Sequence, residues 1–240
     1  RYWPRVESTF ALRERWQSTE PGSTAFWLVH GSDGSLHIYG KTADSRRADP
    51  DDGQRIGAWL LCESLNAHGE HICFEYKADD QDLDTVRDYR AQRYLWRVLY
   101  GNAQAHAAPY AFGAQTPADL QWHFHLLFDY GERSRSLTEV PVYDGDTLQP
   151  WLTREDPFST YGQGFEIGTR RLCQQVLMFH HFPVKLRGKP VLVRRLLLEY
   201  ADTATQWSFS QISAAHSQPY DASGHVESSP PVEFDYSAFT

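Results

Sequence analysis

Histidines in two hydrophobic segments are the strongest candidates for metal chemistry in this sequence. His123 and His125 alternate in WHFHLLF, so they would share one face of a strand, and His180 and His181 are adjacent in MFHHFP. Imidazole is a common zinc ligand, but no carboxylate or thiol is spaced with these histidines as known zinc sites require. The sequence therefore favours histidines that pack or hydrogen-bond within a sheet. We assign no metal ligand, no cofactor-binding residue and no cofactor.

The three cysteines provide neither a disulfide framework nor an evident nucleophile. In WLLCESLNAHGEHICFEY, a four-residue turn from Asn66 to Gly69 would place Cys62 directly opposite Cys73. A cross-strand disulfide is geometrically conceivable there, but such bonds are strained, and two free thiols packed in the sheet are favoured. Cys173 lacks a local base that would activate it.

Acidic and glycine-containing segments match binding motifs only weakly. Segments 49–53 and 144–146 are no better calcium loops than the acidic stretch 79–88, which lacks the turn glycine and final glutamate of an EF-hand. Gly162 and Gly164 favour a tight turn, because no Lys-Ser/Thr pair follows them as in a phosphate-binding loop. No Gly-x-Ser-x-Gly elbow is present. We therefore assign no catalytic residue and expect a non-enzymatic chain. The aspartates of the acidic stretch are Asp79, Asp80, Asp82, Asp84 and Asp88.

Composition limits the classes of protein that this chain can belong to. The net charge of −8 over 240 residues argues against nucleic acid as a partner, because phosphate binding needs a basic face. No run of 18 apolar residues is present, so we expect no membrane-spanning segment. The single methionine, Met178, implies that Arg1 is not a natural start, and we expect one β-rich region over 1–240 that is a fragment of a longer chain.

Six hydrophobic segments end on a tyrosine that a turn-forming or polar residue follows at once. Such segments are typical of β-strands, and aromatic residues, at 14 % of the chain, favour strands as well. The spacing of the tyrosines is irregular, so the repeat is degenerate. We predict a mainly β, antiparallel fold with long loops. The tyrosines, which we expect to be structural residues, are Tyr39, Tyr76, Tyr100, Tyr130, Tyr200 and Tyr236.

Two hairpins can be predicted with a register. A four-residue turn over 31–34 would pair Val29 with Leu36 and Trp27 with Ile38. A turn of the same length over 66–69 would place Trp59 opposite Tyr76 and Leu61 opposite Phe74. Further strands are predicted at 93–100, 121–130, 171–182, 191–200, 206–213 and 231–236. Loops are predicted over 102–119, 133–150 and 216–230, and 79–92 is predicted as a loop or a short helix.

The densest signature is DPFSTYGQGFEIGTRRLCQQVLMFHHFP, residues 156–183, which we expect to be a centre of packing. With RYWPRVES, LHIYGKT, RYLWRVLYGN, LLFDYGER and PPVEFDYS, it resembles the SpvB family over nearly the whole chain. This is the N-terminal region shared by a Salmonella plasmid virulence protein and the B component of bacterial Tc insecticidal toxin complexes. The resemblance implies degenerate Rhs/YD-like strand repeats that form part of a curved shell.

The resemblance also implies a function. In Tc toxins the B and C components form a hollow β-sheet shell that encloses a toxic polypeptide, and a propeller in B docks the shell to the pore. We expect a secreted, non-catalytic shell segment, made in the bacterial cytoplasm, whose partners are other shell parts or a C-component-like chain and its effector cargo. Neither the propeller nor a transferase Glu-x-Glu pair is present.

Two alternatives remain open from the sequence. In the first alternative, which is the second hypothesis after the shell segment, the chain is an N-terminal secretion or docking module of an SpvB-like ADP-ribosyltransferase toxin. Loops 102–119 and 133–150 would then contact a partner. A free-standing hydrolase is the third and least favoured reading, because no catalytic constellation is evident. An enzyme predicts ionisable groups that converge in one cleft, whereas a shell predicts a broad sheet without such a cleft.

Overall fold

The computed structural model describes residues 1–2, 9–19, 22–79, 86–105, 120–186, 188–201, 209–221, 223–227 and 229–237. Strands and loops make up these residues, with one short 3-10 helix, η1 (Ala43–Ser45), as their only helix. None of the described helices is long and apolar enough to cross a membrane. The chain divides into two compact units, unit 1 (1–123 with 159–168) and unit 2 (124–158 with 169–240). The prediction of a mainly β, antiparallel chain with long loops is confirmed.

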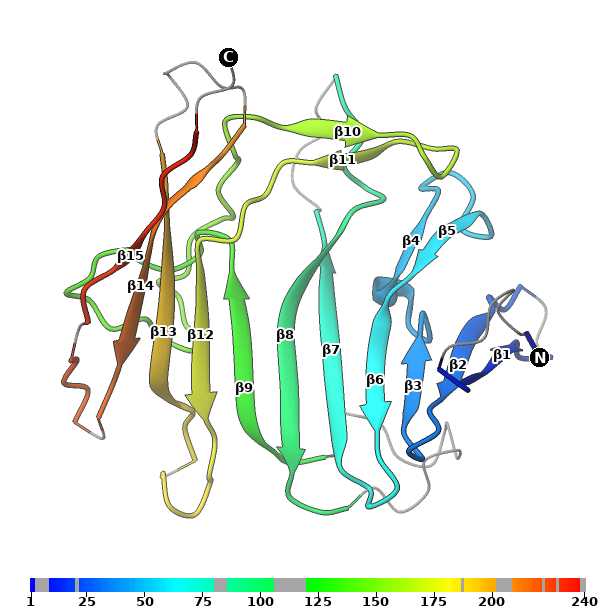
Figure 1. The fold of residues 1–240 in the computed structure, drawn as a ribbon, viewed down its shortest axis with the longest axis horizontal. Coiled ribbons are helices and arrows are strands. Elements are labelled where there is room, and N and C mark those ends of the chain that lie inside the picture. The colour runs from blue at the N-terminus through cyan, green and yellow to red at the C-terminus, as the bar shows by residue number, and fades with distance from the viewer. Residues whose placement is uncertain are drawn as a thin grey trace. The chain divides into compact units, whose positions relative to one another are not determined.

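Unit 1 is built on antiparallel strands in the order β1-β2-β3-β6-β7-β8 (Figure 1). Alternating apolar positions of these strands form a buried cluster of Leu28, Leu36, Ile38, Cys62 and Leu65. Short strands β4 (Arg46–Ala48) and β5 (Ile56–Trp59) pair separately, as do β10 (Phe158–Thr160) and β11 (Ile167–Thr169). The bounds are Leu12–Trp16 for β1, Phe26–His30 for β2, Leu36–Tyr39 for β3, Leu61–Leu65 for β6, His71–Ala78 for β7 and Arg93–Asn102 for β8.

The register predicted for the first hairpin is wrong by one residue. Val29 lies opposite His37, and Trp27 lies opposite Tyr39, because the loop that closes the hairpin is shorter than expected. The Gly31 N–H donates to the Ser35 carbonyl at 2.8 Å, so the loop contains three residues. Gly34 takes φ +80° there, which a residue with a side chain adopts at a cost.

The second hairpin is displaced for the same reason. The Asn66 N–H donates to the Glu70 carbonyl at 3.1 Å and closes another three-residue loop, which ends on a glycine with positive φ. Glu63 therefore lies opposite Cys73, and Cys62 occupies a bulge against β3, where its Sγ donates to the Ile38 carbonyl at 3.2 Å.

The longer-range pairs predicted for that hairpin are also wrong. Trp59 lies in β5 and pairs with Arg46 of β4, because β5 ends at Trp59 and the next strand, β6, begins only at Leu61. Tyr76 lies opposite Leu95 of β8, and β6 pairs with β7 only over residues 63–65, so Leu61 does not face Phe74.

Unit 2 is built on antiparallel strands in the order β9-β12-β13-β14-β15 (Figure 1). Strand β14 continues through Pro219, so the loop predicted to begin at 216 begins four residues later. The strand predicted over 206–213 begins at Ile212 among the described residues, and that over 171–182 is shorter at both ends. The bounds are Trp122–Asp129 for β9, Gln175–His180 for β12, Val191–Tyr200 for β13, Ile212–Pro219 for β14 and Val232–Glu233 for β15.

The strand-end tyrosines do not share one environment. Tyr39 and Tyr200 end their strands, and Tyr130 directly follows β9, whereas Tyr76 and Tyr100 lie two residues before the ends of theirs. Tyr130 is 7 % exposed and stacks beside Trp151 at 4.8 Å between ring centroids. Tyr236, by contrast, is 53 % exposed. The repeat therefore marks strands better than it marks core positions.

Candidate functional site: an open apolar sheet face

Four polar side chains from neighbouring strands of unit 2 form a buried row, here called the polar ladder: Asp129 (β9), Gln175 (β12), Arg195 (β13) and Gln218 (β14). Each is at most 1 % exposed. Asp129 lies opposite Gln175, and Arg195 lies opposite Gln218. Arg195 Nε donates to Gln175 Oε1 at 2.6 Å, and Gln175 Nε2 donates to Asp129 Oδ1 at 3.3 Å. The ladder thus connects four strands through side-chain hydrogen bonds.

The polar ladder binds the backbone of the loop that follows β9. Arg195 donates to the Ser136 carbonyl at 2.8 Å and to the Ser134 carbonyl at 3.0 Å. Gln218 Nε2 donates to the Leu137 carbonyl at 3.0 Å. Since buried carbonyls need a donor, these bonds hold the loop against this face of the sheet.

Arg133 fixes the second half of the same loop. Its guanidinium pairs with Asp129 at 2.9 Å and donates to the carbonyls of Val142 and Tyr143, each at 2.6 Å. The Tyr143 ring then packs against the buried cluster beside the ladder. This face of the sheet in unit 2 is therefore covered, and it combines the polar ladder with a buried apolar cluster.

The opposite face of the same strands is apolar and open. Phe128, Val176 and Leu196 lie side by side on β9, β12 and β13. Leu198, Ala215 and Val232 form a second row across β13, β14 and β15. None of these belongs to a buried cluster of the described residues, and Leu196 and Val232 are 40 % and 61 % exposed. The covered face also holds the buried apolar side chains of Leu127, Leu177 and Phe179, so apolar residues occupy both faces of this sheet.

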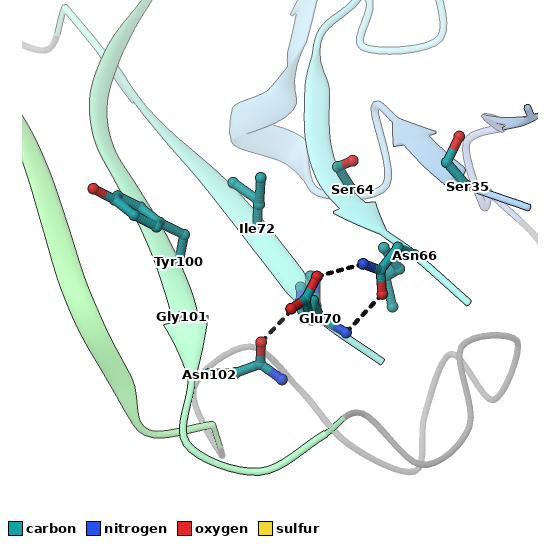
Figure 2. Close-up of a pocket in the computed structure, with 10 residues that line it drawn as sticks. Ser35, Ser64, Asn66, Glu70, Ile72, Tyr100, Gly101 and Asn102 are labelled. Atoms are coloured by element: carbon teal, nitrogen blue, oxygen red, sulfur yellow. Dashed lines mark hydrogen bonds between the residues drawn. The ribbon is translucent and has the colours of Figure 1, made fainter. Parts of the chain in front are cut away.

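Unit 1 has a comparable open face with a hollow at its rim. Ser64, Ile72 and Tyr100 lie side by side on β6, β7 and β8, and Ile72 is 38 % exposed. These side chains line a hollow of about 390 Å³ at the β6–β7 hairpin. Figure 2 shows them with Glu70 beside them. An apolar floor with a few polar groups is typical of a binding site.

Three of the four candidate histidines, His125, His180 and His181, pack against other rings. His125 shares a 2.7 Å hydrogen bond between its Nδ1 and the Tyr143 hydroxyl, and its ring lies 5.4 Å from that of His181. His180 packs edge-on against Phe124 at 5.1 Å, and burial lowers its pKa. The structure brings together His125 and His181 but shows no group of three or more potential metal ligands among the described residues.

The other candidates have structural surroundings. Cys62, Cys73 and Cys173 are free thiols, and burial raises the pKa of Cys173 to about 12. Asp49 pairs with Arg55 at 2.6 Å. The turn expected around Gly164 is confirmed by its φ of +84°. Asp79 is buried and Asp88 pairs with Arg90, whereas Asp80, Asp82 and Asp84 lie outside the described residues.

Sequence reasoning missed the polar ladder and a second buried group in unit 1. There Glu63 binds Lys41 at 2.8 Å and lies 3.3 Å from His71, which is 1 % exposed. The available signal was a polar residue at an inward position of an apolar strand, such as Arg195 in LVRRLLLEY. Period-two alternation alone does not identify which face is covered.

Comparisons with known proteins agree with this architecture. The family model described as "Salmonella virulence plasmid 65kDa B protein" matches residues 1–182. The mono(ADP-ribosyl)transferase SpvB of Salmonella typhimurium is 45 % identical over 231 residues, covering 94 % of this chain and 38 % of that protein. This chain thus spans less than half the length of the curated relatives that it matches.

Solved structures show the same likeness. The N-terminal domain of the effector SpvB from Salmonella typhimurium superposes with a TM-score of 0.82 at 44 % identity, covering 91 % of this chain and 68 % of that one. TcdB2-TccC3 superposes with a TM-score of 0.86 at 38 % identity, covering 100 % of this chain and 12 % of that one. A Photorhabdus luminescens Tc holotoxin pore superposes with a TM-score of 0.85 at 37 % identity, covering 97 % of this chain and 11 % of that one.

Proposed function

This chain belongs to the SpvB family, and we propose that it is a non-catalytic wall segment of a secreted bacterial toxin. Its open apolar sheet face contacts a toxic polypeptide that the toxin encloses or presents. Its partners are the other parts of the shell, or a C-component-like chain, and the effector cargo. The likeness to TcdB2-TccC3 along the whole chain supports this assignment.

The observation that supports the proposal best is that the sheet of unit 2 is apolar on both faces, although the described residues cover only one of them. A soluble sheet with one covered face normally buries its apolar side chains. Here the covered face already buries Leu177 beside the polar ladder, while Val176 and Leu196 on the opposite face are left for another occupant. An unfolded effector exposes apolar side chains of its own, and the hydrophobic effect favours their contact with such a surface.

Binding of an unfolded polypeptide tests the proposal. Fluorescence anisotropy with labelled, reduced and alkylated lactalbumin should show binding by this chain, and Leu196→Glu should weaken it. Val184→Glu is the matched control, because Val184 is 98 % exposed in a turn outside the open face. If both variants bind the reporter as well as the parent chain does, the open face is not a cargo surface.

A second function, a docking module for an attached transferase, is favoured by the loop that the polar ladder holds. Leu137, Val140 and Val142 in this loop are 39 %, 49 % and 45 % exposed although its backbone is anchored. Exposed apolar side chains on an ordered loop are typical of partner contacts. Val140→Asp in the full toxin separates the functions, because it should impair docking and leave the lactalbumin binding unchanged.

A further inference from the structure

The hollow at the rim of the open face of unit 1 has an apolar floor and one acidic wall. Ile72 and Tyr100 lie opposite each other on β7 and β8 and form the floor. Glu70, at the end of the hairpin loop, forms the wall, and its side chain is exposed. Figure 2 shows Glu70 beside Asn66 and Asn102 at the mouth of the hollow. The hollow therefore combines an aliphatic and aromatic surface with a carboxylate.

Local hydrogen bonds hold Glu70 in place. Asn66 Oδ1 accepts from the N–H groups of His68 at 2.9 Å and Glu70 at 3.0 Å, and Asn66 Nδ2 donates to the Glu70 carboxylate. Asn102 Oδ1 accepts from the His71 N–H at 2.9 Å and adds a bond to the neighbouring strand. The carboxylate is thus positioned by a turn and not by an opposite charge.

The charge of Glu70 is not balanced within the described part of the chain. No basic side chain there forms an ion pair with it, and no residue that lines the hollow is Lys or Arg. The hydroxyls at the mouth already have partners, since Ser64 Oγ bonds His37 Nδ1 at 2.9 Å and Ser35 Oγ bonds Asp33 at 2.6 Å. The Glu70 carboxylate is therefore the group whose interactions a ligand would complete.

We propose that this hollow receives a basic side chain, lysine or arginine, from an extended segment of the cargo. The inference rests on the proposed function, because it supplies a polypeptide at the open face. The aliphatic stem would lie on Ile72, and the cationic head would pair with Glu70 at the mouth of the hollow. The net charge of −8 favours the approach of such a segment.

Methyl NMR with labelled isoleucine tests the assignment directly. The probe is a short valine- and threonine-rich peptide with a central lysine, compared with the same peptide carrying a central glutamate. The lysine peptide should shift the Ile72 methyl resonance saturably and leave that of Ile212 in unit 2 unchanged. Glu70→Gln, which keeps an acceptor for Asn66, should weaken binding about threefold to fivefold, the range of an exposed ion pair.

Glu139→Gln is the matched control, because Glu139 is exposed in the loop after β9. Equal binding of the lysine and glutamate peptides, equal affinities of the two glutamine variants, or no shift at Ile72 would each overturn the assignment. The lactalbumin experiment with Leu196→Glu tests the proposed function in unit 2. If only the lysine peptide fails to bind, the assignment of the hollow is wrong, and the proposal that the open face of unit 2 contacts cargo is unaffected.

Discussion

Replacing Arg195 should destabilise the protein more than any neighbouring substitution in β13. Its side chain is 0 % exposed and donates to four oxygens, at 2.6, 2.8, 3.0 and 3.3 Å. Arg195→Met keeps most of the buried stem but leaves those acceptors without donors. Removing one partner from such a buried polar network costs about 3–5 kcal/mol. That is a large fraction of a total stability of about 5–15 kcal/mol.

Urea unfolding of Arg195→Met and Arg194→Met provides the assay and its control. Arg194 is adjacent in sequence but exposed, so its replacement should change the free energy of unfolding by less than about 0.5 kcal/mol. Hydrogen exchange should also accelerate in the 131–152 loop of Arg195→Met. Equal midpoints for the two variants would refute the reasoning that the polar ladder stabilises unit 2.

Three further predictions follow from single contacts. Tyr130→Ala should cost about 3 kcal/mol because its ring is buried against Trp151, whereas Tyr236→Ala should cost less than about 1 kcal/mol; equal melting temperatures would contradict this. Burial opposes ionisation of Asp156, but hydrogen bonds from Arg154 and Ser210 lower its pKa below the ordinary value. The Asp156 carboxylate therefore binds a proton more weakly in the native state than in the unfolded state, and its ionised form stabilises the fold above about pH 4. This stabilisation should disappear as the pH falls below that value, and Asp156→Asn should remove it. Urea titrations of the parent chain and the variant at several pH values measure the difference. All three thiols should react slowly with Ellman's reagent at pH 8 until the chain unfolds, since burial of each sulfur raises its pKa; rapid labelling of the native protein would contradict this.

The sequence was sufficient to predict strand type because apolar alternation and terminal tyrosines report on local structure. Strands at 93–102, 122–129 and 191–200 lie close to their predicted ranges. Register was not predicted correctly, because a three-residue loop with glycine last, as at Gly34 and Gly69, and a four-residue turn are both compatible with the same residues. Strand β4 was missed because its residues, Arg46–Ala48, include no hydrophobic run, and β5 was missed because its apolar residues run on directly into those of β6.

The candidate site was harder to predict than the fold. The open face depends on which side of each strand another segment covers, and that segment, residues 131–152, shows no periodicity. Arg195 and Gln175 are polar residues in apolar surroundings, a pattern equally typical of solvent-exposed positions. Only the paired strands show that the two side chains lie on the same covered face and form a hydrogen bond with each other.

The polar ladder has a consequence for how the strands of unit 2 find their partners. In most sheets a one-residue slip is penalised because it moves apolar side chains into water. In unit 2 that penalty is weak, since apolar residues such as Leu196 and Leu177 occupy both faces. A slip of β13 against β12 would instead separate Arg195 from Gln175 and leave the loop carbonyls without donors. Hydrogen-bond matching, and not hydrophobic burial, therefore selects the correct alignment of these strands during folding.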